Sequence, residues 1–463
     1  MNFKVLFLFI TVFTYSLAVK TSYDGYKVYK VVPKSADEVK ILEDLQKTAI
    51  CEFWEDQIYV DHAVKVMVAP ENQNAFLKML KMSKIETTEV IGDLQRTIND
   101  QLNPSNIRSS ESLFSLTWDQ YYPLDVIYNW LDELAANYPG VVSTVVIGRS
   151  VENREIKGIV INFKPEREQT LISMLEGTLH AREWISAATV TWIIKEFLTS
   201  QDPEIRSLAE NFEWHIFPVV NPDGYVYTFT NNRMWRKNRS TASYQVCAEG
   251  VNDDMSNGVD LNRNFNFFWM SVGASNDSCT NTYAGPSPAS EPETRAIVDY
   301  VLGLNNRGKI IYYIAFHSFT QLIIVPYSHL SSSGDEGRAS NYADMFEIAI
   351  RGSDSLAQRF GTTYRVGVSA EVMYPMSGTS FDWVKYEVDV PIVYLFELRD
   401  LGEYGFLLPP RQIEGTGLET VDALVGMDKA AKTLGYYESS ASSGLVIAKD
   451  FNVPRRILLP IST

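Results

Sequence analysis

The sequence predicts an α/β protein in which a mixed central β-sheet lies between helices, preceded by a small α+β domain. Uninterrupted apolar runs recur after residue 116, and such runs are typical of strands buried on both faces. Amphipathic helical stretches alternate with these runs, as expected for a layered α/β domain. Ahead of them, residues 24–101 contain two rounds of strand, helix and strand, the order of a ferredoxin-like sandwich. A chain of 463 residues is long enough for both domains.

Sequence patterns in the small domain predict its helices and strands. Residues 26–32 are strand-like, and Ser35 begins a capping-box pattern for the helix that follows. Valines alternate with other residues over 64–68, which predicts a strand covered on one side. A second helix is expected at 71–82 and a last strand at 85–91.

Composition divides the chain into four parts. Residues 1–18 have a basic start, an apolar run and small residues at the end, which predicts a secretory signal peptide and an extracellular product. The apolar run is shorter than the ~20 residues of a membrane span, so no membrane partner is expected. Residues 101–112 read as a polar linker, so we assign the small domain to 19–108 and the large domain to 109–435. A C-terminal extension, 436–463, follows.

In the large domain, apolar residues around Trp130 recur with helical spacing, and several apolar runs predict strands. These runs are residues 141–147, 156–163, 216–220, 310–316 and 392–398. Together they predict the mixed sheet.

Charge and cysteine content exclude some classes of protein. The net charge of −16 argues against nucleic acid as a partner. A monomer is expected. Cys247 and Cys279 could close a loop, which would leave Cys51 single, and secretion permits disulfides. Sequons at Asn238 and Asn276 leave glycosylation at either position open.

The histidines narrow the search for a metal site. His180 and Glu183 stand about one helical turn apart, and an imidazole and a carboxylate so placed suit zinc. The same spacing also fits a surface pair. His317 ends an apolar run and is the natural third ligand, with a satisfied core histidine as the alternative. No metal is assigned to the remaining histidines, His62, His215 and His329.

Three further charged residues are candidates for catalysis or substrate binding. Glu397 ends the apolar run 392–396 and is the candidate general base, with an ion pair to Arg399 as the alternative. Arg236 and Arg263 have apolar neighbours that can fix them, and a substrate that ends in a carboxylate needs a bidentate cation. Either arginine could instead belong to a surface ion pair.

A set of motifs then occurs in one order along the chain. They are HAREW at 180–184, NPDGY at 221–225, RMWRKNRS at 233–240, GVDLNRNF at 258–265, HS at 317–318 and FELRDLGEYGFLLP at 396–409. Together they resemble the pancreatic-type zinc metallocarboxypeptidases of the A/B subfamily, over essentially all of residues 19–435. The resemblance implies a carboxypeptidase-like fold, one zinc ion, and a zymogen whose small domain is the activation domain. The implied reaction is hydrolysis of the C-terminal peptide bond of peptides and proteins.

The resemblance also implies a role for each site residue. Zinc would bind to His180, Glu183 and His317, with Asp260 accepting the outer N–H of His180. Glu397 would be the general base and Arg236 would stabilise the oxyanion. The implied substrate contacts are Arg182, Asn262, Arg263, Ser318, Tyr374 and Phe381.

The expected specificity follows from the same resemblance, and the expected site of activation follows from the polar linker. Phe381 takes the pocket-floor position at which basic-specific members place an acid, so apolar or aromatic C-terminal residues are expected. The expected pocket walls and small polar contributors are Ile324, Met376, Leu395, Ser328, Ser369 and Thr379. Glu371 is the alternative source of negative charge, which would favour Lys or Arg instead. A trypsin-like protease is expected to activate the precursor by cleavage after Arg108.

The departures from the family pattern are few. Phe319 stands where the family often has tyrosine, and the stretch from Cys247 to Asp260 is longer than usual. Three alternatives remain: an inactive peptide-binding homologue, a hydrolase of another mechanism, and a regulatory-type carboxypeptidase. The candidate catalytic residues are all present, which argues against an inactive homologue. The absence of a GxSxG motif argues against a hydrolase of another mechanism. The N-terminal unit argues against a regulatory-type carboxypeptidase.

Overall fold

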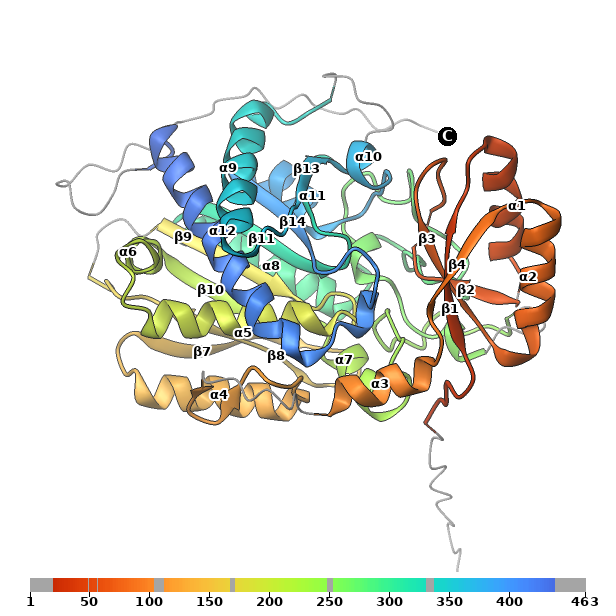
Figure 1. Ribbon diagram of the computed structural model, residues 1–463. Coiled ribbons are helices and arrows are strands. Elements are labelled where there is room, and N and C mark those ends of the chain that lie inside the picture. Colours follow the sequence, from red (N-terminus) through yellow and green to blue (C-terminus); the bar gives the residue numbers. More distant parts are fainter. Residues whose placement is uncertain are drawn as a thin grey trace, which may run out of the picture.

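The computed structural model describes residues 20–48, 50–55, 57–103, 112–166, 171–247, 253–329 and 337–437. A small domain lies beside a large α/β domain, against the side where several of its loops gather (Figure 1). The expected signal peptide, the bond after Arg108 and nearly all of the C-terminal extension lie outside the described residues. Among the described residues, none of the helices has both the length and the apolar character needed to span a bilayer.

The small domain has the predicted ferredoxin-like order. Its elements are β1 (Lys27–Val32), α1 (Ala36–Gln46), β2 (Cys51–Phe53), β3 (Val64–Val68), α2 (Gln73–Met82) and β4 (Glu86–Ile91). The strands form an antiparallel sheet in the order β2-β3-β1-β4. Ser35 caps α1 as predicted, because its Oγ accepts the Glu38 N–H at 3.3 Å.

Two expectations for the small domain are wrong, and both errors concern its contact with the large domain. Residue 101 does not begin a linker, because a helix, α3 (Leu94–Leu102), ends there and buries Gln101. Strand β3 is buried along its whole length and not on one side only. One of its faces packs on the domain's own helices, and Lys65 and Met67 on the other face lie against the large domain, where Lys65 Nζ approaches the Phe319 ring.

The large domain contains the predicted mixed sheet, with eight strands in the order β13-β12-β14-β11-β9-β10-β8-β7. The strands are β7 (Val142–Arg149), β8 (Glu155–Ile161), β9 (Leu171–Gly177), β10 (Glu213–Phe217), β11 (Lys309–Ser318), β12 (Leu322–Val325), β13 (Arg365–Val368) and β14 (Ile392–Leu398). The central pairs β10–β9, β9–β11 and β11–β14 are parallel, whereas β7–β8, β8–β10 and β12–β14 are antiparallel. A short hairpin, β5 (Ser112–Leu113) and β6 (Leu116–Thr117), precedes the sheet.

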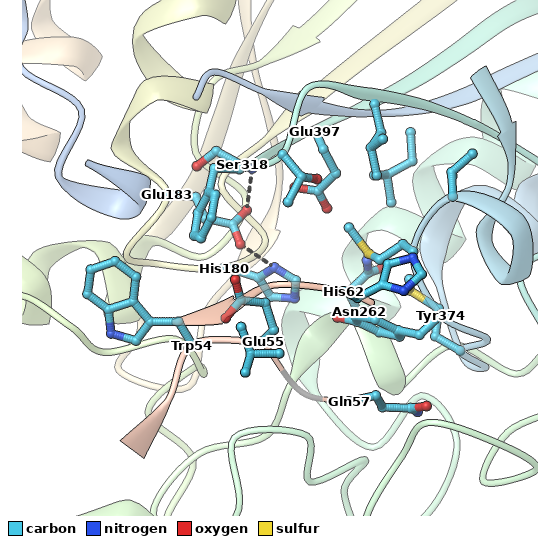
Figure 2. Close-up of a pocket in the computed structure, with 18 of the residues that line it drawn as sticks. Trp54, Glu55, Gln57, His62, His180, Glu183, Asn262, Ser318, Tyr374 and Glu397 are labelled. Carbon is cyan, nitrogen blue, oxygen red and sulfur yellow. Dashed lines mark hydrogen bonds and ion pairs between the residues drawn. The ribbon is translucent and has the colours of Figure 1, made fainter. Parts of the chain in front are cut away.

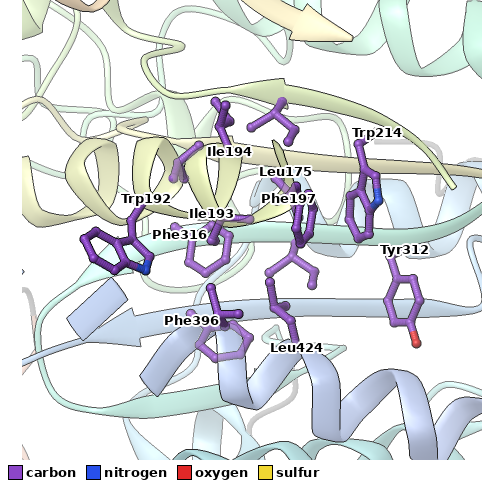
Figure 3. Packing of buried hydrophobic residues seen from close by; sticks show 14 of the residues in the cluster. Leu175, Trp192, Ile193, Ile194, Phe197, Trp214, Tyr312, Phe316, Phe396 and Leu424 are labelled. Carbon is purple, nitrogen blue, oxygen red and sulfur yellow. The ribbon is translucent and has the colours of Figure 1, made fainter. Parts of the chain in front are cut away.

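Helices cover both faces of the sheet, as the apolar strands predicted. The helices are α4 (Leu124–Asn137), α5 (Trp184–Thr199), α6 (Pro203–Asn211), α7 (Pro222–Thr230), α8 (Pro292–Arg307), α9 (Tyr342–Phe360), α10 (Ser369–Val372), α11 (Ser380–Trp383) and α12 (Ile413–Thr433). On one face, Trp192 and Phe197 of α5 and Leu424 of α12 pack on Phe316 and Phe396 (Figure 3). Residues of α8 and α11 form the apolar layer on the opposite face.

The packed part of the large domain continues beyond the boundary predicted at residue 435. Tyr436 and Tyr437 are buried, and the Tyr437 hydroxyl lies 2.8 Å from that of Tyr312 and donates to Asp428 Oδ1 at 2.7 Å. These contacts make the start of the expected C-terminal extension part of the core.

Candidate metal centre and substrate cleft

The carboxyl ends of three neighbouring parallel strands, β9, β11 and β14, bring the candidate catalytic residues together. His180 and Glu183 lie in the turn between β9 and α5, and Glu183 is the residue before that helix. His317 lies near the end of β11, in register with Glu397 on β14. Parallel strands place their carboxyl ends at one edge of a sheet, so residues far apart in the sequence meet there.

His180, Glu183 and His317 converge on one buried point. Their candidate ligand atoms all lie within 4.8 Å of one another. The two Nδ1 atoms of the histidines are 3.0 Å apart, and Glu183 Oε1 and Oε2 lie 2.8 and 3.0 Å from the Nδ1 atoms of His180 and His317. Two imidazole nitrogens and a carboxylate around one point are a catalytic zinc donor set. The residues therefore fit the metal that the sequence predicted.

Asp260 holds both the outer side of His180 and the guanidinium of Arg236. His180 Nε2 lies 3.0 Å from Asp260 Oδ1, and a proton on that nitrogen leaves Nδ1 available to a metal. Arg236 donates from Nε and Nη2 to Asp260 Oδ2 at 3.0 and 2.9 Å. Burial raises the pKa of Asp260, but the charges of Arg236, His180 and Arg263 outweigh burial and hold it well below its usual range. Asp260 thus remains a carboxylate.

The two arginines that the sequence left open are both buried in this region and not on the surface. Arg236 pairs with Asp260, as described above. Arg263 donates from Nε to the Gly273 carbonyl at 2.7 Å and from Nη1 to the Asn262 carbonyl at 3.0 Å. Asn262 is itself held, since its Oδ1 accepts the Ser380 N–H at 3.0 Å. Arg263, Asn262 and Tyr374 all line the cavity that His180 and Glu183, two of the candidate metal ligands, also line.

Two further expected site residues, Glu397 and Ser318, also line this cavity (Figure 2). The Ser318 backbone N–H donates to Glu183 Oε2 at 3.2 Å and so helps to orient a candidate metal ligand. The alternative partner of Glu397, Arg399, instead pairs with Glu419, donating from Nε at 2.7 Å.

The residues expected to shape the specificity pocket divide into two groups. Met376 and Leu395 line the cavity, together with Leu322, Val372 and Met373. Phe381 and Ile324 are buried in an apolar cluster with Leu395 and are not among the residues that line the cavity. The small polar residues Ser328, Ser369 and Thr379 are also buried and outside the lining. Glu371 is exposed, forms an ion pair with Arg338 at 2.8 Å and is not among the residues that line the cavity.

The small domain covers the cavity. From the small-domain side, the cavity is lined by Trp54, Glu55, Gln57, Tyr59 and His62 (Figure 2). The volume of the cavity is about 120 Å³. His62, to which the sequence assigned no metal, therefore belongs to the cover of the cleft.

Specific bonds attach this cover to the rim of the cleft. Arg182, expected to bind the substrate, donates to the Trp54 carbonyl at 3.2 Å and lies 3.6 Å from Glu52 Oε1. Gln57 donates to the Pro375 carbonyl at 3.3 Å, next to Tyr374. The small domain therefore contacts Arg182 and the backbone next to Tyr374, two residues that were expected to bind the substrate.

A second attachment, which the sequence reasoning missed, joins α3 to the large domain. Arg233 donates from Nε to Gln101 Oε1 at 2.8 Å, and Gln101 donates to the carbonyls of Phe406 and Leu408 at 3.2 and 3.1 Å. Arg233 also lies over the Trp184 ring, 3.7 Å from its centroid, and burial lowers its pKa to about 9. Arg233 stands in the motif at 233–240, but no spacing in the sequence indicates a partner in another domain.

The cysteines and the histidines outside the candidate metal site form structural contacts. Cys247 and Cys279 form the disulfide that the sequence left open, with Cα atoms 5.8 Å apart, and Cys51 is unbridged among the described residues. His215, to which no metal was assigned, is buried between Glu213 and the Tyr300 hydroxyl. His329 stacks on Phe268, with ring centroids 3.9 Å apart.

Comparison with known proteins agrees with both domains. Residues 127–423 match the family described as zinc carboxypeptidase, and residues 29–101 match the carboxypeptidase activation peptide. Zinc carboxypeptidase A 1 from Anopheles gambiae is 38% identical over 90% of this chain and 92% of its own length. Carboxypeptidase A2 from Mus musculus is 34% identical over 89% of this chain and 95% of its own length.

Solved structures are similar over the same extent. Carboxypeptidase A from Helicoverpa armigera matches with a TM-score of 0.77 at 29% identity, covering 89% of this chain and 98% of that one. Thrombin-activatable fibrinolysis inhibitor matches with a TM-score of 0.77 at 30% identity, covering 87% and 98%.

Proposed function

This chain belongs to the zinc carboxypeptidase family and carries the family's activation peptide, and we propose that it is a secreted enzyme of A-type specificity. It releases single apolar or aromatic residues from peptide C-termini after the small domain has been cut off. One observation carries this proposal. His317 lies in register with Glu397 and groups with His180 and Glu183. His180, Glu183 and Glu397 line a cleft that Arg263 also lines.

We assign the chemistry to residues around that cleft. Zinc, when bound, supplies a Lewis acid for the scissile carbonyl and lowers the pKa of water to about 7. Glu397 takes the proton of the attacking water and returns it to the departing amine. Arg236 donates N–H groups to the developing oxyanion, and its bonds to Asp260 fix the plane of the guanidinium.

The substrate is held at its C-terminus by a second set of residues. Asn262, Arg263 and Tyr374 bind the terminal carboxylate, which favours a planar cation with several N–H donors. Arg182 and Ser318 contact the peptide further from its end. Removal of the small domain releases Arg182 from Trp54 and Glu52. Arg182 therefore contacts the small domain in the precursor and the substrate in the active enzyme.

The lining of the cleft supports an apolar preference for the C-terminal residue. Among the described residues that line it, the carboxylates are Glu55, Glu183 and Glu397, the first from the small domain and the others at the reaction centre. Glu371, the alternative acid, is paired with Arg338. A Lys or Arg head group would find no dedicated partner, and an unpaired buried charge is costly.

Latency follows from the covered cleft. We place the activating cut after Arg108, a site for a trypsin-like protease, because the polar stretch after α3 is the expected linker between the domains.

The test is hydrolysis of blocked dipeptides ending in Phe, Leu, Lys, Arg and Glu, before and after trypsin, with N-terminal sequencing of the active form. We expect activity only after cleavage at Arg108, with Phe and Leu preferred by kcat/KM. Glu371→Ala is the matched variant and is expected to leave the preference unchanged. A preference for Lys or Arg, or full activity in the intact precursor, would overturn the proposal.

A further inference from the structure

The two sequons of this chain lie in opposite surroundings. Asn238 is fully buried and uses both ends of its amide. Its Nδ2 donates to Glu291 Oε2 at 2.8 Å and to Glu293 Oε2 at 3.0 Å. Its Oδ1 accepts the backbone N–H groups of Ser240 and Val259 at 3.2 and 2.8 Å. An oligosaccharide on Nδ2 would remove a donor from two carboxylates and has no space in this core.

Asn276 lies in an exposed turn on the rim of the large domain. The turn is fixed by short-range bonds, since Asp277 N donates to Ser275 Oγ and Cys279 N donates to Asp277 Oδ1, both at 3.0 Å. The disulfide to Cys247 anchors its far end. An attached glycan at Asn276 would therefore extend into solvent without disturbing the fold.

The third sequon residue, Ser278, makes this site easy to test. Its side-chain oxygen is buried and has no hydrogen-bond partner among the described residues. The backbone carbonyl of Ser278, in contrast, accepts the Lys237 ammonium at 2.7 Å. Ser278→Ala thus removes the sequon while it leaves these contacts in place.

We propose that Asn276 carries an N-linked glycan and that Asn238 does not. This rests on the secretion that forms part of the proposed function. In the transfer, the Asn276 amide nitrogen bonds to C1 of the first N-acetylglucosamine of a lipid-linked oligosaccharide. The lipid pyrophosphate leaves, and the amide loses one proton.

The position also fixes where the glycan goes on activation. Asn281, in the same rim segment, donates to Glu52 of the small domain at 3.3 Å, yet Asn276 is exposed with the small domain in place. The precursor therefore accommodates the glycan without releasing its inhibitory domain. After cleavage at Arg108, the glycan remains on the catalytic fragment.

The experiment expresses the full chain in insect cells and measures intact mass and peptide maps of protein from the medium, with and without peptide-N-glycosidase F. We expect the parent to lose the mass of one oligosaccharide, with deamidation confined to Asn276. Ser278→Ala is expected to show no shift, and Ser278→Thr, which keeps the sequon, to restore it. Ser240→Ala removes the other sequon without touching Asn238, and it is expected to shift like the parent.

The outcomes separate this inference from secretion itself. If the native leader yields no protein in the medium, secretion fails, and a heterologous leader then delivers the same chain for the glycan test. A secreted parent without a shift would refute the assignment of Asn276. A shift that persists in Ser278→Ala, or that disappears in Ser240→Ala, would assign the glycan to Asn238 and overturn the inference.

Discussion

Two buried clusters of histidine and carboxylate lie at opposite ends of the large sheet. The first contains His180, Glu183 and His317 at the carboxyl ends of β9 and β11. The second contains Glu213 and His215 at the beginning of β10, which runs parallel to β9. In both clusters an imidazole nitrogen lies 2.8 Å from a carboxylate oxygen, so the local geometry of the pairs is alike.

The difference is the source of the positive charge. In the second cluster, Arg307 Nη2 donates to Glu213 and lies 2.9 Å from His215 Nε2, so the chain supplies its own cation. In the first, two Nδ1 atoms face one another at 3.0 Å beside one carboxylate, an arrangement that suits a bound metal ion. In this chain, the His–Glu pair at the candidate metal site gains a second histidine, whereas the other His–Glu pair gains an arginine.

The largest expected effect comes from breaking the first cluster. Chelation, or His317→Ala, is expected to reduce hydrolysis by the trypsin-activated enzyme to background, because the Lewis acid and the acidified water are lost together. Zinc should restore the chelated parent but not the variant, measured by kcat/KM and by metal content. His215→Ala is the counterpart in the second cluster and should retain one zinc per chain. Equal metal loss in both variants would remove the distinction between the clusters.

A somewhat smaller loss is expected at Glu397, which borders the first cluster without being a ligand. Glu397→Gln keeps the size of the side chain but cannot accept a proton, so kcat is expected to fall by roughly 10²–10⁴-fold. Zinc content and substrate KM should stay close to those of the parent. Turnover within a few-fold of the parent would show that another residue is the base.

Asp260, the carboxylate next to Nε2 of His180, allows a further test of the comparison. Asp260→Asn is expected to weaken zinc affinity by roughly 10–100-fold, the usual effect of removing a partner of a metal-bound histidine. Competition with a chromogenic chelator measures this affinity. Glu213→Gln, which changes the carboxylate of the second cluster, should leave zinc affinity unchanged. An unaltered affinity in Asp260→Asn would argue against its role in orienting His180.

Arg233 is a buried cation whose partner Gln101 belongs to the other domain. Gln101→Leu removes an acceptor of the guanidinium, and such bonds contribute about 1.5–3 kcal/mol. We therefore expect the lag between tryptic cleavage and full activity to shorten by about 10-fold or more. Gln73→Ala, on the exposed surface of the small domain, is the control and should keep the parental lag. An unchanged lag in Gln101→Leu would show that this contact does not retain the cleaved domain.

The smallest effect is expected in the second cluster and concerns stability alone. The hydrogen bond from His215, followed by the charges of His215 and Arg307, overcomes burial and lowers the pKa of Glu213 to about 2. A carboxylate whose pKa is lower in the folded than in the unfolded state stabilises the protein at every pH above the unfolded-state pKa. This stabilisation is lost as the pH falls toward the folded-state pKa of about 2. Glu213→Gln should therefore lower Tm at pH 7, with a gap to the parent that narrows on acidification below about 4.5. A gap that is constant with pH would exclude this electrostatic origin.

The sequence by itself determined the elements and the candidates for the chemistry. Apolar runs overlap five strands of the large sheet, β7, β8, β10, β11 and β14, but did not mark β9, β12 or β13. The capping pattern at Ser35 marked the first helix, because both signals depend on local spacing. The same runs ended at His317 and Glu397, which indicated that both lie at a sheet edge. The motif resemblance then supplied an expected role for each site residue.

Only the tertiary structure decided which side chains meet. It pairs Arg236 with Asp260 and Arg399 with Glu419, and it places the guanidinium of Arg307 next to His215. It also buried both faces of β3 and turned the expected linker at Gln101 into an interdomain contact. The physical reason is that these partners are distant in sequence, and the free energy of a buried charge depends on the groups that the whole fold places around it.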